Sequence, residues 1–448
     1  MSKGTTKKET VKRISQLPVL ISTAAGIDVS DKEMMVAYPI NSEQLEVRSF
    51  GCFTCDLHAI ARCLKQANIT SIAMESTGVY WISLFLILQE YEFEVYLVNA
   101  SHVKNVTGRK DDETDAEWIQ KLHSCGLLQP SFQPDLLTRD LRDLVRQRKT
   151  LVQESSKCIN RMQKAMEQMN LKLHTIISDI DGKTGLSIIE AILKGERDPE
   201  ILADLRDKRI QASREDIIKS LEGTWNPVHM LVLKQNYQIY NSYHQLISET
   251  DREIEQTLLA QIAAKNDGVV PRLLKSKRKV GIKNKISFDL TAYIKAILEV
   301  DVTQIVGISE ISALTILSEV GTDMTKWKTE RHFVSWLGLA PNTKKSGGKV
   351  ISSKIKKKKH HAGQAFRMGA SSLYGSKNAL GDFYRRIRSK SGGPEAVVAT
   401  AHKLAIIYYK MVSKKEGYDP KAMEAFQEKY KKNKINQLKK KLAQLQAA

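Results

Sequence analysis

Two kinds of hydrophobic pattern alternate along the first 130 residues of the chain. Short apolar runs bounded by turn residues predict strands, and segments in which apolar residues recur every three or four positions predict helices. The predicted order is three strands, helix, strand, helix, strand, helix. The strands are expected over residues 24–29, 34–39, 45–50, 69–74 and 93–98, and the helices over 57–64, 80–91 and 113–125. This alternation predicts an α/β domain at the amino terminus.

A longer helical pattern begins near Asp135. Apolar and small residues recur there at alternating steps of three and four, which is the spacing of a coiled-coil seam. The seam consists of Leu141, Leu144, Arg148, Leu151, Ser155, Cys158, Met162, Ala165 and Met169. Further long, charged helical stretches follow over 200–262. We predict a helical, coiled-coil region whose seam joins two copies of the chain, with helix packing inside one chain as the alternative.

The third region, from Asp301 onward, is also mostly helical. Residues 306–321 combine a glycine turn with an apolar helix, which predicts a helix-hairpin-helix-like element. In such an element the amides at a helix N-terminus contact phosphates without reading sequence, although ordinary helix capping accounts for the same glycines. A second helix ends at Pro341, a basic loop is expected over 342–349, and Pro394 starts a further helix.

Acidic residues stand at the ends of elements in the amino-terminal domain. Asp28 ends the first predicted strand, Glu75 follows the fourth, and Asp112 and Asp115 lie at the start of the last predicted helix. The order of elements is that of an RNase H-like (RuvC-like) fold, which carries its acids in these positions. Carboxylates are hard oxygen ligands suited to holding two Mg²⁺ ions across a phosphodiester. The sequence therefore predicts a metal site that cuts or joins nucleic acid.

The net charge of +20 is concentrated in one part of the chain. Residues 344–415 contain 18 Lys and Arg against 2 Asp and Glu. A basic segment of this length favours a polyanionic partner, because neutralising phosphates releases their counterions. The lysine run over 356–359 alone would fit a solvated charge run or a localisation signal. Since basic residues continue well beyond it, we expect a nucleic-acid partner.

The cysteines argue against a zinc site, and the apolar runs argue against a secreted or membrane-spanning protein. Cys52 and Cys55 form one CxxC, but no second pair stands at zinc-ligand spacing. The amino terminus is polar and basic and lacks the apolar core of a secretory leader. The longest apolar runs are too short to span a bilayer, so we expect a cytoplasmic protein.

Short motifs in three parts of the chain are informative in combination. They are GIDVS at 26–30, MESTGVYW at 74–81 with GRKDDETDA at 108–116, and WLGLAP at 336–341 with SGG at 346–348 and FYRR at 383–386. In this order they resemble the DEDD transposases of bacterial insertion sequences, the insertion-sequence one-ten family with its eleven-eleven branch. The resemblance covers most of residues 20–130 and 300–413 and is weak through the central helices.

This resemblance implies a set of site residues. In the family the RuvC-like domain binds Mg²⁺ through four acids, which map to Asp28, Glu75, Asp112 and Asp115. A serine of the carboxy-terminal transposase domain becomes joined to DNA, and the Ser-Gly-Gly motif maps it to Ser346.

Two features of the sequence leave these assignments open. In the family, position 111 is usually Thr or Ser, but here it is Asp. On a helix, Asp111 would share a face with Asp115 just as Asp112 would. The motif register favours Asp112. Residue type alone does not separate Ser346 from the other serines of the basic stretch. These are Ser352, Ser353, Ser371 and Ser372.

The resemblance also implies an organisation and a set of partners. We expect a RuvC-like DEDD domain over 1–133, a coiled-coil region over 134–299, a mostly helical transposase domain over 300–417 and a charged helical tail over 418–448. Family members act on donor and target DNA with an element-encoded guide RNA. The metal site of one subunit works with the serine of another, so a dimer or tetramer is implied. The expected location is the bacterial cytoplasm, in association with the nucleoid.

Three other functions compete with this interpretation. A RuvC-like Holliday-junction resolvase or nuclease would use the four acids and metal-activated water without a protein nucleophile. The carboxy-terminal domain with its Ser-Gly-Gly motif counts against it. A nucleic-acid-binding protein with a dead metal site is disfavoured because all four acids are present. A sugar-kinase-like ATPase would need a phosphate-binding glycine between Val29 and Glu33, and there is none.

Overall fold

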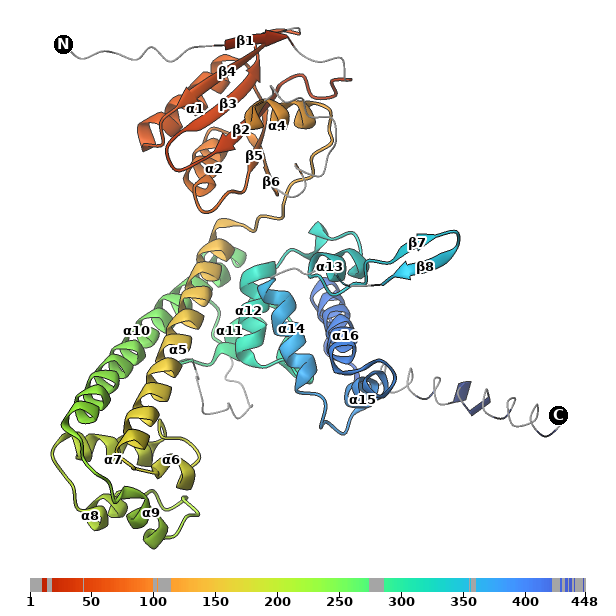
Figure 1. Ribbon diagram of the computed structural model, residues 1–448. Coiled ribbons are helices and arrows are strands. Elements are labelled where there is room, and N and C mark those ends of the chain that lie inside the picture. The colour runs from red at the N-terminus through yellow and green to blue at the C-terminus, as the bar shows by residue number, and fades with distance from the viewer. Residues whose placement is uncertain are drawn as a thin grey trace, which may run out of the picture. The chain divides into compact units, whose positions relative to one another are not determined.

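The structure is a computed structural model (Figure 1). It describes residues 10–13, 18–42, 44–99, 103, 114–273, 286–353, 355, 360–420 and isolated positions beyond. The chain divides into two compact units, residues 1–133 and 134–448, and each is described by itself.

The first unit is a mixed β-sheet with helices on both faces (Figure 1). Its strands are β1 (Thr10–Arg13), β2 (Ala24–Val29), β3 (Met34–Pro39), β4 (Gln44–Phe50), β5 (Ser71–Glu75) and β6 (Glu94–Val98), and its helices are α1 (Thr54–Gln66), α2 (Trp81–Glu90) and α4 (Asp115–Ser124). The spatial order is β1-β4-β3-β2-β5-β6, with β5 and β6 parallel to β2 and the other pairs antiparallel. From β2 to α4 this is the predicted order of elements. The short edge strand β1 was not predicted.

The two faces of the sheet bury different residues of the same strands. Ile27 and Met74 pack in one core with residues of α1 and α2. Ala73, the neighbour of Met74, packs in a second core with Ile119 of α4. This alternation is the period of two that a strand imposes on its side chains. It means that α4 covers the face opposite to α1 and α2.

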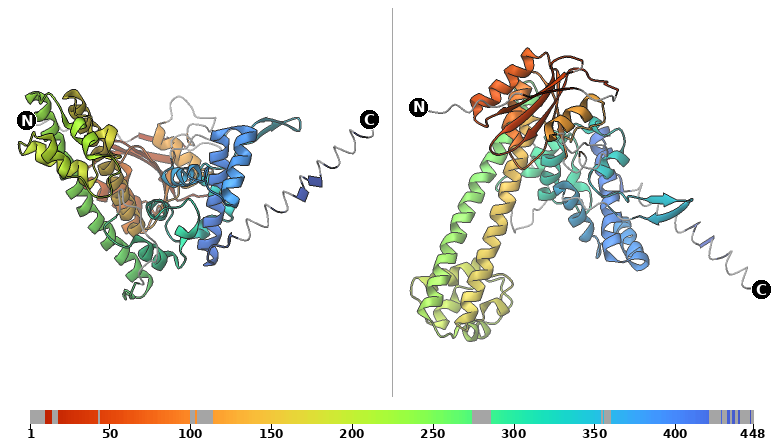
Figure 2. Two further views of the ribbon diagram at one scale, coloured as in Figure 1. Left: turned by 90° about the horizontal axis from the view of Figure 1, so that it is seen from below. Right: turned by 45° about the horizontal axis from the view of Figure 1, so that its top comes forward.

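The second unit begins with a long helical arm. Helix α5 (Leu136–Gln168) lies beside α10 (Pro227–Lys265) along most of its length, as both views of Figure 2 show. Four short helices cap one end of the arm (Figure 1). They are α6 (Leu173–Ile176), α7 (Lys183–Leu193), α8 (Pro199–Asp204) and α9 (Arg214–Leu221).

The arm corrects one prediction, that the heptad seam joins two copies of the chain. Seam residues of α5 such as Leu141 and Met162 are fully buried within the single chain, where α5 packs on α10. Arg148, a polar seam position, forms a buried ion pair with Asp251 of α10 at 2.5 Å. The predicted alternative, packing inside one chain, is the observed one. A heptad pattern fixes the apolar face of a helix but does not say which helix covers it.

The remainder of the second unit is mostly helical. It contains α11 (Leu290–Leu298), η1 (Val302–Gln304), α12 (Glu310–Val320), η2 (Met324–Lys326), α13 (Glu330–Trp336), β7 (Lys344–Ser346), β8 (Lys349–Ser352), α14 (His361–Ser371), α15 (Ala379–Ser391) and α16 (Gly393–Lys414). Aromatic side chains from α13, α14 and α16 pack on one another and on Trp327, the residue after η2. Phe333 contacts the rings of Trp327, Phe366 and Tyr408 at centroid distances of 5.0 to 6.5 Å.

Residues 342–349 differ from the prediction. Instead of a loop, β7 and β8 form an antiparallel hairpin (Figure 1). The segment is rich in lysine and glycine, which are not strand formers, so periodicity gave no signal for it.

The glycine turn before α12 has a packing role. A Cβ built at Gly307 would lie 2.6 Å from the carbonyl oxygen of Gly369 in α14. The glycine therefore permits close contact between two backbones, and the helix-hairpin-helix-like element stays a prediction. The tail expected over 418–448 lies mostly outside the described residues. None of the helices in the described parts of the chain combines the length and apolar character needed to cross a bilayer.

Candidate active site

Strands β2 and β5 bring two of the predicted acids together. They are parallel, and their last hydrogen-bonded pair joins Ile27 to Met74. One position further, the same register places Asp28 beside Glu75. Because successive side chains point to opposite faces, both carboxylates lie on the face away from Ile27 and Met74. That is the face covered by α4.

Helix α4 runs antiparallel to β2, so its first turn lies towards the acids. The Nε2 of Gln120 donates to the carbonyl oxygen of Ala24 at 3.2 Å, at the start of β2. Gly26 lies against the backbone of α4 nearer the helix start. Two residues of strand advance about as far as one turn of helix. The next step along β2 is Asp28, and the first residue of α4, directly before Ala116, is Asp115.

Gly26 makes this close approach possible. A Cβ built on it would lie 2.2 Å from the amide nitrogen of Gln120 and 2.4 Å from the carbonyl oxygen of Ala116. Both are backbone atoms, which cannot move without displacing the helix. The glycine of the GIDVS motif is therefore required by the packing of α4, two residues before Asp28. Sequence reasoning gave this glycine no role.

A capping box fixes where α4 begins. The amide of Glu117 donates to Thr114 Oγ1 at 3.3 Å, and the amide of Thr114 donates to Glu117 Oε2 at 2.7 Å. The helix therefore starts at Asp115, two residues later than predicted. Asp111 and Asp112 lie outside the described part of the chain. The predicted helix face shared by Asp112, or by Asp111, with Asp115 therefore stays a prediction.

The far end of α4 is held by a buried histidine. The Nε2 of His123 lies 2.8 Å from Ser71 Oγ, and its ring centroid is 4.6 Å from that of Tyr96. Burial lowers the pKa of His123 to about 4, so the ring is neutral at neutral pH. This contact at the start of β5 fixes the rotation of α4 about its axis.

The carboxylates of these acids are oxygen donors of the kind that binds divalent cations. Asp28 and Glu75 are half-buried, and Asp115 is exposed at the helix start. Thr77 Oγ1 donates to Glu75 Oε1 at 3.1 Å, which orients that carboxylate. Among the described residues, however, no three His, Cys, Asp or Glu side chains are grouped closely enough to hold a metal ion. The structure thus brings Asp28 and Glu75 together at the ends of neighbouring strands. It does not test Asp112, the fourth predicted acid.

The predicted serine lies on the β7–β8 hairpin. Ser346 ends β7 and pairs with Lys349, the first residue of β8. Gly347 and Gly348 form the two-residue turn between them, with φ of +55° and +75°. Positive φ at both central positions is the geometry of a type I′ turn, which glycine adopts without strain. A Cβ at either glycine would meet nothing within 4 Å, so backbone conformation rather than crowding requires glycine here.

The hairpin places Ser346 among cations. Paired residues of antiparallel strands share a face, so Ser346 lies with Lys349. The register shifts between Lys344 and Lys345, and beyond this irregularity Lys344 pairs with Ser352. Lys345 and Val350 occupy the opposite face. Residues 344–350 are all exposed. Ser346 thus lies on an exposed hairpin whose two strands carry Lys344, Lys345 and Lys349.

The base of the hairpin is fixed by the WLGLAP segment. Arg367 of α14 donates to the carbonyl oxygen of Gly338 at 2.8 Å, and His402 Nδ1 of α16 lies 3.1 Å from that of Leu339. The rings of Trp336 and His360 are 4.1 Å apart. These contacts hold the chain on both sides of the hairpin against α14 and α16. The motif therefore holds the base of the hairpin that carries Ser346.

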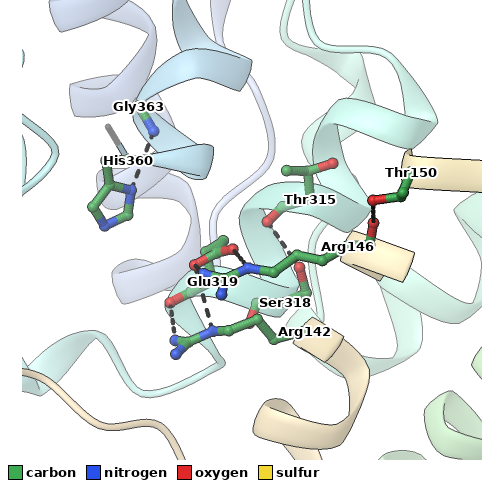
Figure 3. A network of polar contacts seen from close by, with 8 residues as sticks. All are labelled: Arg142, Arg146, Thr150, Thr315, Ser318, Glu319, His360 and Gly363. Carbon is green, nitrogen blue, oxygen red and sulfur yellow. Dashed lines mark hydrogen bonds and ion pairs between the residues drawn. The ribbon is translucent and has the colours of Figure 1, made fainter. Parts of the chain in front are cut away.

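A polar network ties this part of the second unit to the arm (Figure 3). Arg142 of α5 donates to the carbonyl oxygens of Ser318 and Glu319 at 3.3 and 3.0 Å, which caps the C-terminus of α12. Arg146 binds the Glu319 carboxylate through two hydrogen bonds of 2.9 and 3.0 Å. Glu319 is buried, so this paired geometry offsets the cost of placing its charge inside the protein.

Two family models match the chain, one over the predicted acids and one over the predicted serine. The DEDD transposase model of the IS110 family matches residues 25–171, which include Asp28, Glu75, Asp112 and Asp115. The model described as Transposase IS116/IS110/IS902 family matches residues 301–385, which include Ser346. Together they span about half of the 448 residues. No curated protein matches the chain.

These matches identify the class of protein. The first implies an RNase H-like fold for the amino-terminal unit and dependence on a divalent metal. Both imply DNA substrates and a recombination reaction. The chain belongs to the IS110 family of DEDD transposases and is a DNA transposase.

Proposed function

We propose that this transposase cuts and rejoins DNA through a covalent bond between Ser346 and a DNA phosphate. The observation that carries the proposal is the Gly347-Gly348 turn, which presents the serine beside Lys349 on an exposed hairpin. An exposed position suits a substrate as large as a duplex. The metal site of Asp28, Glu75, Asp112 and Asp115 would assist.

The serine chemistry follows from the composition of the hairpin. The Ser346 oxygen would bond to the phosphorus of a phosphodiester and give its proton to solvent. The bond from phosphorus to one DNA oxygen would break, and that oxygen would leave as a hydroxyl protonated from solvent. The ammonium groups of Lys344 and Lys349 would offset the negative charge that develops on the phosphate. Because one phosphate ester replaces another, a DNA hydroxyl can later displace the serine and rejoin a strand without an external energy source.

The acids would supply the metal-assisted part of the reaction. When bound, Mg²⁺ would polarise the phosphate and stabilise the oxygens that enter and leave. Asp28 and Glu75 would be held in place by the β2–β5 register, and Asp115 by the capped start of α4. Neutral substitutes at these positions would keep the shape of the site and lose its affinity for cations.

Partners and organisation complete the proposal. We propose that an element-encoded RNA guides the choice of donor and target DNA, and that the protein works as a homo-oligomer. We also propose four parts, with the DEDD domain over 1–133, the arm over 134–299, the transposase domain over 300–417 and a charged tail over 418–448. Family membership supports these statements, and the buried seam of α5 supplies no interface for the oligomer.

A second candidate function rests on the acids alone. A RuvC-like resolvase or nuclease would use the same carboxylates to activate water and would leave Ser346 without a role. The lysine-flanked presentation of the serine favours the covalent route.

The metal site is tested by neutral substitutions that preserve shape. Asp28→Asn and Glu75→Gln should each lower strand cleavage by at least about a hundredfold, because an amide is a poor ligand for Mg²⁺. DNA binding should stay within about twofold of wild type, since phosphate contacts come from basic residues elsewhere. Cleavage is measured on end-labelled DNA, and binding by filter retention.

Matched controls separate a metal ligand from a general charge effect. Asp31→Asn removes an exposed carboxylate three residues from Asp28 and should leave cleavage unchanged. Asp111→Asn and Asp112→Asn, compared side by side, identify the fourth ligand, and we expect the loss with Asp112. Wild-type cleavage that persists in excess EDTA would overturn the metal assignment.

A further inference from the structure

Helices α15 and α16 pack together and hold two cations against one aromatic ring. The Cζ of Arg386 lies 5.1 Å from the ring centroid of Phe383, and the Nζ of Lys403 lies 5.4 Å from the same centroid. Each contact is a cation–π interaction, which orients the cation over the ring. Two helices therefore place a guanidinium and an ammonium group in one small area.

The neighbouring arginine has a different role. Arg385 donates to the carbonyl oxygens of Tyr374 and Ser376, each at 2.8 Å, and binds the Asp382 carboxylate at 2.5 Å. It therefore joins α15 to the segment that precedes it. Of the two arginines in the FYRR motif, Arg385 is structural and Arg386 lies over the ring with Lys403.

A third cation strengthens the local positive potential. Burial, and then the charges of Arg386 and Lys410, lower the pKa of Lys403. Repulsion between these neighbouring cations raises the free energy of the folded protein. An anion bound between them would reduce that repulsion. A half-buried cluster of like charges is what an anion-binding surface requires.

The lysines of α16 extend the cluster into a row. Lys403, Lys410 and Lys414 are spaced by seven and four residues, so they share one side of the helix. At a rise of 1.5 Å per residue the row is about 16 Å long. Residues 379–414 hold seven Lys and Arg and only two acids, of which Asp382 is bound to Arg385.

We propose that Arg386, Lys403 and Lys410 bind the phosphate backbone of a DNA duplex. The inference rests on the proposed function for its choice of partner, and most of the surface lies beyond the residues that match the family models. A straight row of cations on a rigid helix fits the continuous phosphates of a duplex. Single strands are recognised largely by base stacking on open aromatic faces, and here the Phe383 ring is covered by two cations.

The salt dependence of binding by the full chain tests this surface. Binding of a short fluorescent DNA duplex is followed by anisotropy at several salt concentrations. The double variant Arg386→Gln, Lys403→Gln should bind about tenfold more weakly near physiological salt. Its slope of log K against log [salt] should be smaller by roughly 1.8, because each phosphate contact contributes about 0.9.

Arg388→Gln is the matched control. It removes one charge from α15 two residues further on, where Arg388 lies 4.3 Å from the ring of Tyr374 on another side of the helix. Its salt slope should equal that of wild type. An equal loss of slope in this variant would mean that overall charge, not this surface, is responsible.

A stability measurement guards against trivial misfolding. Lys403→Met keeps the length of the side chain and removes a half-buried charge, so its melting temperature should equal or exceed that of wild type while duplex binding weakens. A fall in melting temperature would assign Lys403 a structural role and overturn the proposal. So would a wild-type slope in the double variant, or a loss of affinity confined to a hairpin RNA. None of these measurements needs Ser346 or a metal ion. Failure of this proposal can therefore be distinguished from failure of the proposed cleavage mechanism.

Discussion

Gly26 is the residue on which the position of α4 most directly depends. Gly26→Ala would place a methyl group against two backbone atoms of that helix, so α4 must move away from β2. We expect a loss of about 3 kcal/mol in the free energy of unfolding, as for other overpacked cores, together with a loss of cleavage. Chemical denaturation and the end-labelled cleavage assay measure the two effects.

Gly375→Ala is the corresponding control for Gly26→Ala. A Cβ there meets no atom within 4 Å, so both stability and cleavage should match wild type. A Gly26→Ala protein as stable as Gly375→Ala would show that α4 does not rest on β2 as described.

His123 makes the stability of the amino-terminal unit depend on pH. Its pKa is about 4 in the folded protein and about 6.5 when unfolded, so the unfolded state binds more protons between these values. The stability from the neutral ring is complete above pH 6.5 and is lost as pH falls towards 4, by about 3 kcal/mol in all. Melting temperatures at pH 7 and pH 5 should therefore differ less for His123→Leu than for wild type. An equal fall in both proteins would contradict the assignment.

The sequence predicted which acidic residues stand at strand ends. It did not predict where two backbones come into close contact. Asp28 and Glu75 stand where apolar runs stop, and the β2–β5 register now puts them side by side. Gly26 gave no signal, because a close approach depends on a helix some 90 residues away in the sequence. Asp112 was assigned by motif register, and that assignment stays a prediction.

Among the elements, the β7–β8 hairpin matters most for the chemistry. Gly347 has φ of +55°, which Asn tolerates and a β-branched residue does not. Gly347→Asn should therefore keep recombination close to wild type, whereas Gly347→Val should lower it at least about tenfold. The melting temperature should change little in either variant, because the hairpin is exposed. Equal activity of the two variants in a recombination assay would show that the turn does not position Ser346.

Helix periodicity predicted α5 well but not the identity of its partner. Apart from the half-buried Leu144, the seam positions are buried as expected. The polar interruption Arg148 is matched by Asp251 more than 100 residues later. Periodicity describes one helix at a time, so packing within a chain and between chains leave the same pattern. The hairpin was missed for a different reason. Its strands are three and four residues long and are specified by a turn rather than by alternating hydrophobicity.

For the whole molecule, the central claim is that a serine on the second unit becomes joined to DNA. The acids of the first unit alone would equally serve a nuclease that uses water. Only a covalent intermediate distinguishes the two, because a water nucleophile leaves no bond between protein and DNA. The serine hypothesis came from a family motif, and the hairpin geometry now gives that motif a physical role.

The most direct test is to look for that bond. Recombination reactions of the full chain with its DNA and RNA are stopped in hot detergent, digested with protease and nuclease, and analysed by mass spectrometry. We predict a nucleotide phosphate on Ser346, present in wild type and in Ser352→Ala, and lost together with recombination in Ser346→Ala. Ser352 lies on the same hairpin and so is the matched control. A phosphate attached to Ser352 or another serine would contradict the assignment of Ser346, and efficient cutting with no adduct would contradict the covalent mechanism itself.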